Sequence, residues 1–132
     1  MKPLSFVFIR LAIGISMFGH GLVRIPKLNS FSEGMVGNFS QSYLPTQLVT
    51  PFSLVLPFLE LFLGIALLLG WKTRIAGIGG ALLMLLLMFG TSMIENWSAL
   101  PSQMIHLLFF VLVHEFHQVN TFSLDASNPP AK

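Results

Sequence analysis

Residues 49–69 read VTPFSLVLPFLELFLGIALLL, an apolar run in which Glu60 is the only charged residue. About 20 apolar residues are enough for a helix to cross the ~30 Å hydrocarbon core of a bilayer. An acidic side chain at the centre of such a helix costs roughly 2.5–3.5 kcal/mol, so it is usually paired and often functional. This stretch therefore predicts a membrane-spanning helix with a functional or paired carboxylate.

The composition of the whole chain also indicates a membrane protein. Of its 132 residues, 54% are hydrophobic and 9% are charged, whereas a soluble domain carries about 25% charged residues. The chain contains no cysteine, which excludes disulfides, zinc–thiolate sites, iron–sulfur ligation and thiol redox chemistry. Its net charge is +2 and its basic residues are scattered, so no nucleic-acid partner is predicted.

Three further apolar runs complete a bundle of four predicted spans, at residues 4–23, 49–69, 75–94 and 100–116. We predict an all-α, integral membrane four-helix bundle that forms a single domain over residues 1–132, with a disordered tail at 120–132. An even number of spans places both termini on one side of the lipid bilayer. Lysine and arginine are more numerous on that side, which predicts cytoplasmic termini. Small residues, including Gly64, Gly77 and Gly80, are expected to let the helices approach closely.

The loop between the first two spans is predicted to contain a short amphipathic helix, outside the cytoplasm. Ser30-Phe-Ser-Glu33 matches a capping box, in which each side chain satisfies the other residue's backbone N–H. The apolar side chains that follow fall on one helical face: Phe31, Met35, Val36, Phe39 and Tyr43. Such a helix lies on the membrane face or caps the bundle, and Leu44-Pro45 is expected to end it.

Arg10, within the first span, is the predicted partner of Glu60. If the two antiparallel spans are centred on the bilayer, the residues differ in depth by only ~3–5 Å. The pair could be structural and lock the first two helices together. Alternatively, it could form the polar floor of a ligand cavity, in which Glu60 changes its protonation state with its surroundings.

A second polar cluster is predicted toward the outer half of the membrane, formed by His20, Arg24, Glu95 and His106. Such a cluster could hold a polar head group or relay protons, although His20 and Arg24 could also be interfacial side chains that reach toward water. A haem held by His20 and His106 suits a four-helix bundle, but no haem-attachment motif supports it.

The histidines of the fourth span do not predict a metal site. His114-Glu-Phe-His117 lacks the spacing of zinc proteases, which place two histidines four residues apart. His114 is instead expected to mark the cytoplasmic exit of the helix.

The ordered set of these motifs resembles the DoxX family of small four-span membrane proteins. The resemblance runs from about Phe6 to Phe116 and is carried by Arg10 with Gly14, Gly19-His20-Gly21, Lys27, Leu44-Pro45, Glu60-x-x-x-Gly64 and Gly70-Trp-Lys-Thr-Arg74. It implies a four-helix bundle in the bacterial inner membrane. The family takes its name from a subunit of an archaeal terminal quinol oxidase, related proteins form a thiosulfate:quinone oxidoreductase, and some members act in assemblies that deal with oxidative stress. Carried over by position, the polar residues expected to matter are Arg10, His20, Lys27 and Glu60.

Three functions are compatible with these features. The first is a subunit of a membrane redox assembly that binds a quinone between its helices, with hydrogen bonds from His20, Glu60 or His106. A partner subunit would have to supply the electrons. The second is a membrane scaffold or assembly protein, whose Arg10–Glu60 pair is structural. The third is a carrier for a small solute or protons, which would need a homo-oligomer because the chain has no visible inverted repeat.

Overall fold

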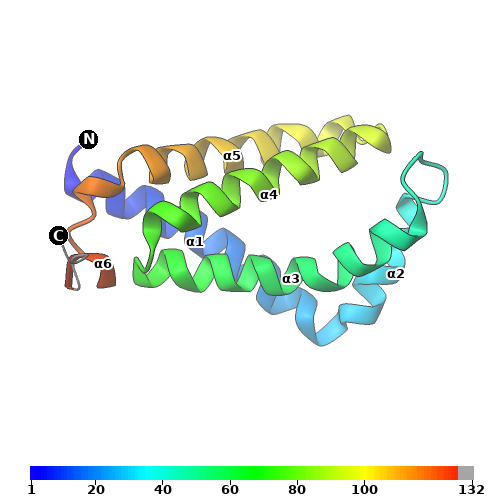
Figure 1. Cartoon of the computed structure of the whole chain (residues 1–132), viewed down its shortest axis with the longest axis horizontal. Coiled ribbons are helices and arrows are strands. Elements are labelled where there is room, and N and C mark those ends of the chain that lie inside the picture. Colours follow the sequence, from blue (N-terminus) through cyan, green and yellow to red (C-terminus); the bar gives the residue numbers. More distant parts are fainter. Residues whose placement is uncertain (128–132) are drawn as a thin grey trace.

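The computed structural model describes residues 1–127, which contain helices and connecting turns but no strand. The elements, in chain order, are α1 (Pro3–Arg24), η1 (Ile25–Lys27), α2 (Leu28–Asn38), α3 (Thr46–Leu69), α4 (Thr73–Met93), η2 (Trp97–Ala99), α5 (Leu100–Glu115), η3 (His117–Val119) and α6 (Leu124–Ser127). Four helical segments are long and apolar enough to cross a membrane, which confirms the predicted all-α four-helix membrane bundle. The start of α1 lies at the same end of the bundle as α6, and α2 lies at the opposite end (Figure 1).

Helices α1 and α3 are antiparallel and touch almost backbone to backbone. A Cβ atom at Gly21 would lie 2.5 Å from the backbone nitrogen of Leu61, and one at Gly64 would overlap the backbone of Phe18. Without a hydrophobic force between helices in lipid, such small-residue contacts drive helix association. These two glycines therefore fix the register of α1 against α3.

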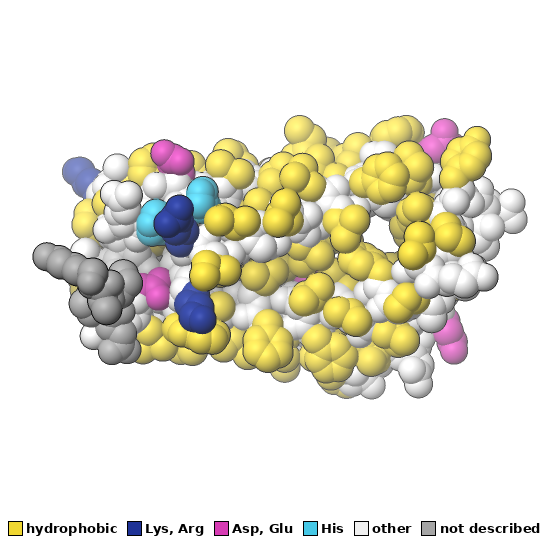
Figure 2. Space-filling model, viewed as in Figure 1, with side chains coloured by type: hydrophobic (Ala, Val, Ile, Leu, Met, Phe, Trp, Pro, Cys, Tyr) yellow, Lys and Arg dark blue, Asp and Glu magenta, His cyan; other side chains and the backbone are white. Residues whose placement is uncertain are grey.

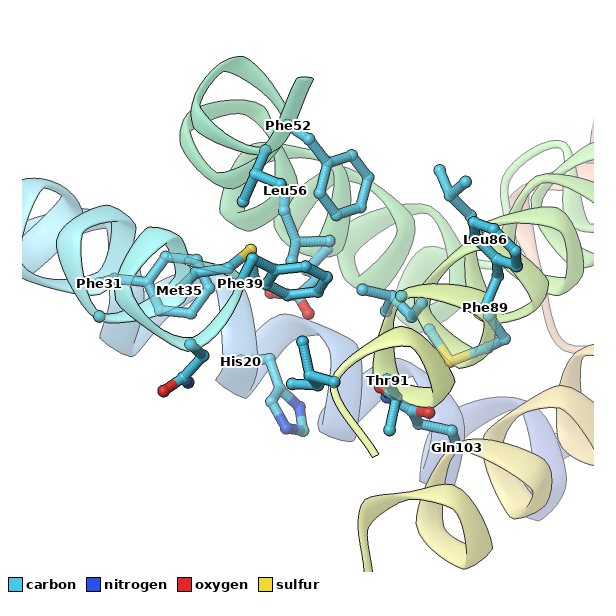
Figure 3. Close-up of a pocket in the computed structure, with 18 of the residues that line it drawn as sticks. His20, Phe31, Met35, Phe39, Phe52, Leu56, Leu86, Phe89, Thr91 and Gln103 are labelled. Carbon is cyan, nitrogen blue, oxygen red and sulfur yellow. The ribbon is translucent and has the colours of Figure 1, made fainter. Parts of the chain in front are cut away.

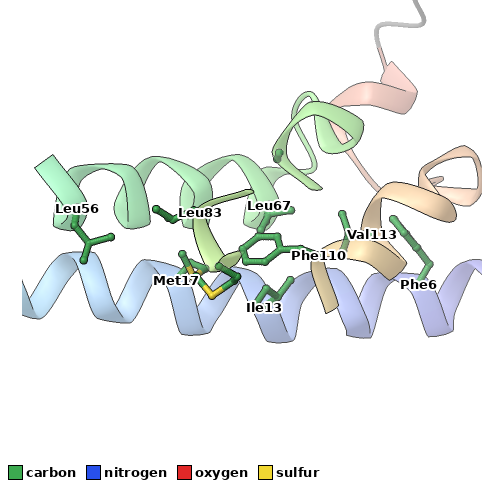
Figure 4. Packing of buried hydrophobic residues seen from close by; sticks show 10 residues of the cluster. Phe6, Ile13, Met17, Leu56, Leu67, Leu83, Phe110 and Val113 are labelled. Atoms are coloured by element: carbon green, nitrogen blue, oxygen red, sulfur yellow. The ribbon is translucent and has the colours of Figure 1, made fainter. Parts of the chain in front are cut away.

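Helices α4 and α5 form the second close pair, as their small residues predict. A Cβ atom at Gly77 would lie 2.9 Å from the backbone nitrogen of His114, and one at Gly80 would overlap the ring of Phe110. The two pairs come together through a shared core (Figure 4). Its buried apolar side chains come from all four spans: Phe6, Ile13, Met17, Leu56, Leu67, Leu83, Met84, Phe110 and Val113.

Many large apolar side chains face outward instead of inward. They cover the flank of the bundle in Figure 2, whereas lysine, arginine and histidine side chains gather near the end that carries the termini. Lipid tails are as apolar as leucine, so side chains of this kind are suited to a bilayer. Exposed examples on three different helices are Phe8, Phe62 and Leu82.

Two prolines, Pro51 and Pro57, lie inside α3. Because proline has no N–H, the carbonyl of Ser53 loses its usual helical hydrogen bond to residue 57. Helices α3 and α4 are joined near α6 and diverge toward the opposite end of the bundle, where the first part of α3 runs alongside α2 (Figure 1).

Helix α2 covers that end and is anchored to α3. The hydroxyl groups of Ser32 and Ser53 are buried and 2.6 Å apart, and Phe31 and Met35 pack against the core. A Cβ atom at Gly90 of α4 would lie 3.2 Å from the ring of Phe39, so the chain just after α2 also reaches α4.

The predicted start and end of α2 were wrong. The helix begins at Leu28 because the turn η1 leads directly into it, and the N-cap residue before it, Lys27, makes no side-chain capping bond. Ser30 and Glu33 therefore lie within the helix and form no capping box. The helix ends at Asn38, and Tyr43 is 96% exposed instead of sharing the apolar face.

The predicted tail also needs correction, because its first residues make specific contacts. Asn120 is buried, and the carboxylate of Asp125 accepts hydrogen bonds from the backbone nitrogens of Lys72 and Thr73, at 2.6 and 2.8 Å. These bonds satisfy free N–H groups at the start of α4. The remainder of the predicted disordered tail, residues 128–132, lies outside the described residues.

Candidate functional site

A cavity of about 760 Å³ lies in the half of the bundle covered by α2. All four spans and α2 contribute to its wall, which is mainly apolar and rich in phenylalanine and methionine (Figure 3). The apolar lining includes Met17, Phe31, Met35, Phe39, Phe52, Leu56, Met84 and Phe89. The lining contains four ionisable side chains, which come from α1, α3 and α5: His20, Arg24, Glu60 and His106.

The carboxylate of Glu60 is paired with Arg24. Nη1 of Arg24 donates hydrogen bonds to both oxygens of Glu60, at 2.7 and 2.8 Å. Glu60 is 4% exposed, so the ion pair compensates for the hydration that the carboxylate loses on burial. The guanidinium carbon of Arg24 also lies 4.7 Å from the centre of the Phe31 ring, a cation–π contact that connects the ion pair to α2.

The predicted Arg10–Glu60 pair was wrong, and the packing of α1 on α3 explains why. Because Gly21 faces Leu61, Glu60 lies level with the last turn of α1, about 12 residues beyond Arg10. At ~1.5 Å per residue this is a separation of roughly 18 Å along the helix, which no arginine side chain spans. The prediction assumed that both spans were centred at the same depth, whereas the glycine contacts shift them.

Arg10 instead belongs to a separate network at the opposite end of the bundle. It is buried and donates hydrogen bonds to Oδ1 of Asn120, at 2.7 Å, and to the carbonyl oxygen of Phe122, at 2.9 Å. Nδ2 of Asn120 donates in turn to the hydroxyl of Thr73, at 2.8 Å. Gly70 makes room for this network, because a Cβ atom there would overlap the guanidinium of Arg10. Arg10 thus ties α1 to the segment after α5 and lies outside the cavity.

The two cavity histidines are linked through Ser16, a residue that no pattern in the sequence singles out. Nδ1 of His20 lies 2.7 Å from the carbonyl oxygen of Ser16, and Nε2 of His106 lies 2.7 Å from the Ser16 hydroxyl. Nδ1 of His106 lies 2.7 Å from the carbonyl oxygen of Ser102. The two rings meet edge to face, with their centroids 6.0 Å apart.

Another polar pair at the cavity wall was also missed. Nε2 of Gln103 donates to the hydroxyl of Thr91 at 2.8 Å, while Oε1 of Gln103 is buried and has no hydrogen-bond partner within residues 1–127. Both side chains line the cavity. Glutamine and threonine are uncharged and common in helices, so only their position in the fold distinguishes them.

The other predicted site residues lie away from the cavity. Lys27 is exposed in η1, and Glu95 is exposed in the turn after α4, with a backbone φ of 54°. His114 lies beside Gly77 near the end with the termini, and its ring stacks on that of His117 with a centroid separation of 6.2 Å. Within residues 1–127, no three His, Cys, Asp or Glu side chains are arranged to hold a metal ion.

One exposed edge of the cavity lies between α3 and α4, where the two helices separate. Leu48, Leu86 and Phe89 line the cavity there and are at least half exposed. The other exposed lining residues include small or polar ones on α2 and α5: Ser30, Gly34, Asn38 and Ser102. A soluble molecule would meet an apolar rim there, whereas a lipid-soluble molecule would meet side chains like its own tail. The cavity therefore offers an apolar route from the bilayer to a buried polar end.

Comparisons with known proteins point to one family. No curated protein and no solved structure matches the chain. The model of the DoxX family matches residues 5–93, a segment that includes nearly all of α1, the whole of α2, α3 and α4, and three of the four ionisable cavity residues, His20, Arg24 and Glu60. The match covers more than half of the chain, and the protein therefore belongs to the DoxX family.

Proposed function

We propose that this DoxX-family protein is a non-catalytic, quinone-binding subunit of a membrane redox assembly. The observation that carries the proposal is the cavity, which combines a long apolar wall with one polar end formed by His20, Arg24, Glu60 and His106. Small-molecule sites have this composition, a mainly apolar cleft of about 300–1,000 Å³ with a few polar groups that orient the ligand.

The edge between α3 and α4 supports a lipid-soluble ligand. A quinone has a flat ring with two oxygens and an apolar tail. The ring would lie at the polar end, and the tail would follow Phe52, Leu86 and Phe89 toward the bilayer. Arg24 uses one guanidinium nitrogen for Glu60, and an arginine has further N–H donors that could bind a ring oxygen.

A partner subunit is part of the proposal. The chain has no cysteine to ligate an iron–sulfur cluster or to form a redox-active disulfide. We therefore place the electron carrier in another protein of the assembly, with this subunit holding the quinone nearby. We also propose an inner-membrane location with both termini in the cytoplasm, the orientation that the excess of lysine and arginine on that side favours.

The experiment is to identify what co-purifies with the protein in mild detergent. Organic extraction and mass spectrometry should recover close to one quinone per chain. Glu60→Gln should lower that ratio several-fold, because it removes the charge that holds Arg24 in place. Glu115→Gln, which changes an exposed carboxylate outside the cavity, is the matched control. Recovery of bulk phospholipid alone from the wild type would contradict the proposal.

A membrane scaffold is the second candidate, because the Arg24–Glu60 pair also joins α1 to α3. If the pair is only structural, Glu60→Gln protein should fail to accumulate, and the wild type should contain no quinone. Immunoblots of membranes from cells that express each variant measure accumulation, and Glu115→Gln again serves as the control.

A further inference from the structure

We propose that Nε2 of His20 is a hydrogen-bond acceptor that makes the cavity select hydroxyl-bearing ring head groups, so that it binds a quinol more tightly than the corresponding quinone. This inference rests on the proposed function, since it specifies which redox form of the ligand the same cavity prefers. It is carried by the hydrogen bonds around Ser16, which determine where each imidazole holds its proton.

The proton of His20 is on Nδ1. This nitrogen lies 2.7 Å from the carbonyl oxygen of Ser16, and a carbonyl oxygen can only accept. A neutral imidazole has one N–H and one bare nitrogen, so Nε2 carries the lone pair. Within residues 1–127, Nε2 of His20 makes no hydrogen bond, and His20 lines the cavity (Figure 3).

His106 has the same tautomer, but its acceptor is already used. Its Nδ1 faces the carbonyl oxygen of Ser102, and its Nε2 accepts from the hydroxyl of Ser16, each at 2.7 Å. The Ser16 hydroxyl therefore donates its hydrogen bond to His106 and is not available to Nε2 of His20. Of the two imidazoles, His20 is the one that keeps a free acceptor for a ligand.

The two redox forms of a quinone differ in what they can offer this nitrogen. A quinone carbonyl only accepts and would leave Nε2 of His20 without a donor. A quinol hydroxyl donates to Nε2 and can still accept an N–H from Arg24. A ligand that covers Nε2 without donating to it leaves this acceptor unpaired, at a cost of about 1–3 kcal/mol, which corresponds to a preference of roughly 5- to 150-fold for the quinol.

The test compares two forms of one soluble analogue, decylubiquinol and decylubiquinone. Binding to the purified full-length protein in lipid nanodiscs is measured anaerobically for each form, by ultrafiltration and mass spectrometry. The quinol should bind at least fivefold more tightly. The dimethyl ether of the quinol, which has no hydroxyl donor, should lose that advantage.

Two substitutions of His20 assign the preference to one nitrogen. In His20→Asn, the amide nitrogen can replace Nδ1 and keep the bond to the Ser16 carbonyl, but nothing replaces Nε2, so both forms should bind equally. In His20→Gln, the amide can reach the position of Nε2 and supply an acceptor, so a preference for the quinol should return. His117→Phe, outside the cavity, is the control.

The outcomes separate the inference from the function on which it rests. Equal binding of both forms to the wild type would overturn the role of His20 and leave the quinone site intact. A preference that persists in His20→Asn would also overturn it. If neither the quinol nor the quinone binds the wild type, both the proposed function and this inference are overturned.

Discussion

The Cα atom of Phe18 in α1 lies so close to Gly64 in α3 that a Cβ atom at position 64 would come within 2.5 Å of it. This contact, together with that of Gly21 on Leu61, places Glu60 beside Arg24 and leaves Arg10 at the other end of the bundle. The identity of the ion pair thus follows from where two backbones touch.

Gly64→Ala should destabilise the bundle, because the methyl group would collide with backbone atoms that cannot turn away. Overpacking of this kind costs about 1–3 kcal/mol. Thermal unfolding in detergent should therefore show a lower midpoint for this variant. Gly79→Ala is the matched control in another helix, since its Cβ atom would meet only a leucine methyl group at 3.8 Å. Equal midpoints for the two variants would contradict the close packing of α1 on α3.

Breaking the ion pair from one side should be worse than removing it from both. Arg24→Met leaves the buried carboxylate of Glu60 without its partner, and a broken buried pair costs about 3–5 kcal/mol. The double variant Arg24→Met/Glu60→Met should recover much of that stability, because neither charge remains. Denaturant unfolding of the wild type, Arg24→Met, Glu60→Met and the double variant gives the coupling energy between the two residues. Strictly additive effects would show that the two residues do not interact.

Asn120→Ala should loosen the segment after α5, because the buried guanidinium of Arg10 loses the acceptor at 2.7 Å. A hydrogen bond to a charged group contributes about 1.5–3 kcal/mol, so faster limited proteolysis after residue 119 is expected. Thr121→Ala, an exposed neighbour, should be cleaved at the wild-type rate. Identical cleavage of Asn120→Ala and wild type would mean that the network does not hold this segment.

The orientation in the membrane can be tested with single cysteines, because the chain has none of its own. A membrane-impermeant maleimide added to spheroplasts should label Tyr43→Cys, whose position is 96% exposed at the α2 end. It should label Lys72→Cys, at the end with the termini, only after the membrane is permeabilised. The reverse pattern would place the termini outside the cytoplasm and overturn the orientation based on positive charge.

The sequence predicted the spans well because hydropathy depends on composition and hardly on neighbours. Residues 4–23 and 49–69 were expected, and α1 and α3 extend them by only a few residues at their ends. Which charged residues pair was harder to predict, because sliding one helix along another by a few turns does not change the hydropathy of any span. Gly21 and Gly64 were visible as small residues, but the residues that they contact depend on the fold.

The cavity was partly predictable for a similar reason. His20, Arg24, Glu60 and His106 stand out because ionisable groups are rare in spans, and all four line the cavity. Ser16 and Gln103 do not stand out, since their importance comes from a partner on another helix. Asn120 and Asp125 were assigned to a disordered tail because polar residues near a terminus usually have no partners; here the partners lie 110 residues away for Asn120 and 53 for Asp125.

The network around Arg10 has a consequence for biosynthesis. Arg10 enters the membrane with the first helix, but the side chain that accepts its hydrogen bond is synthesised 110 residues later. Until then, the nascent chain holds a cationic side chain in an apolar helix without its final partner. The insertion machinery or lipid phosphates must stabilise this charge in the meantime. The completed fold is therefore reached only after residue 120 has left the ribosome, and the order of translation becomes part of how this bundle assembles.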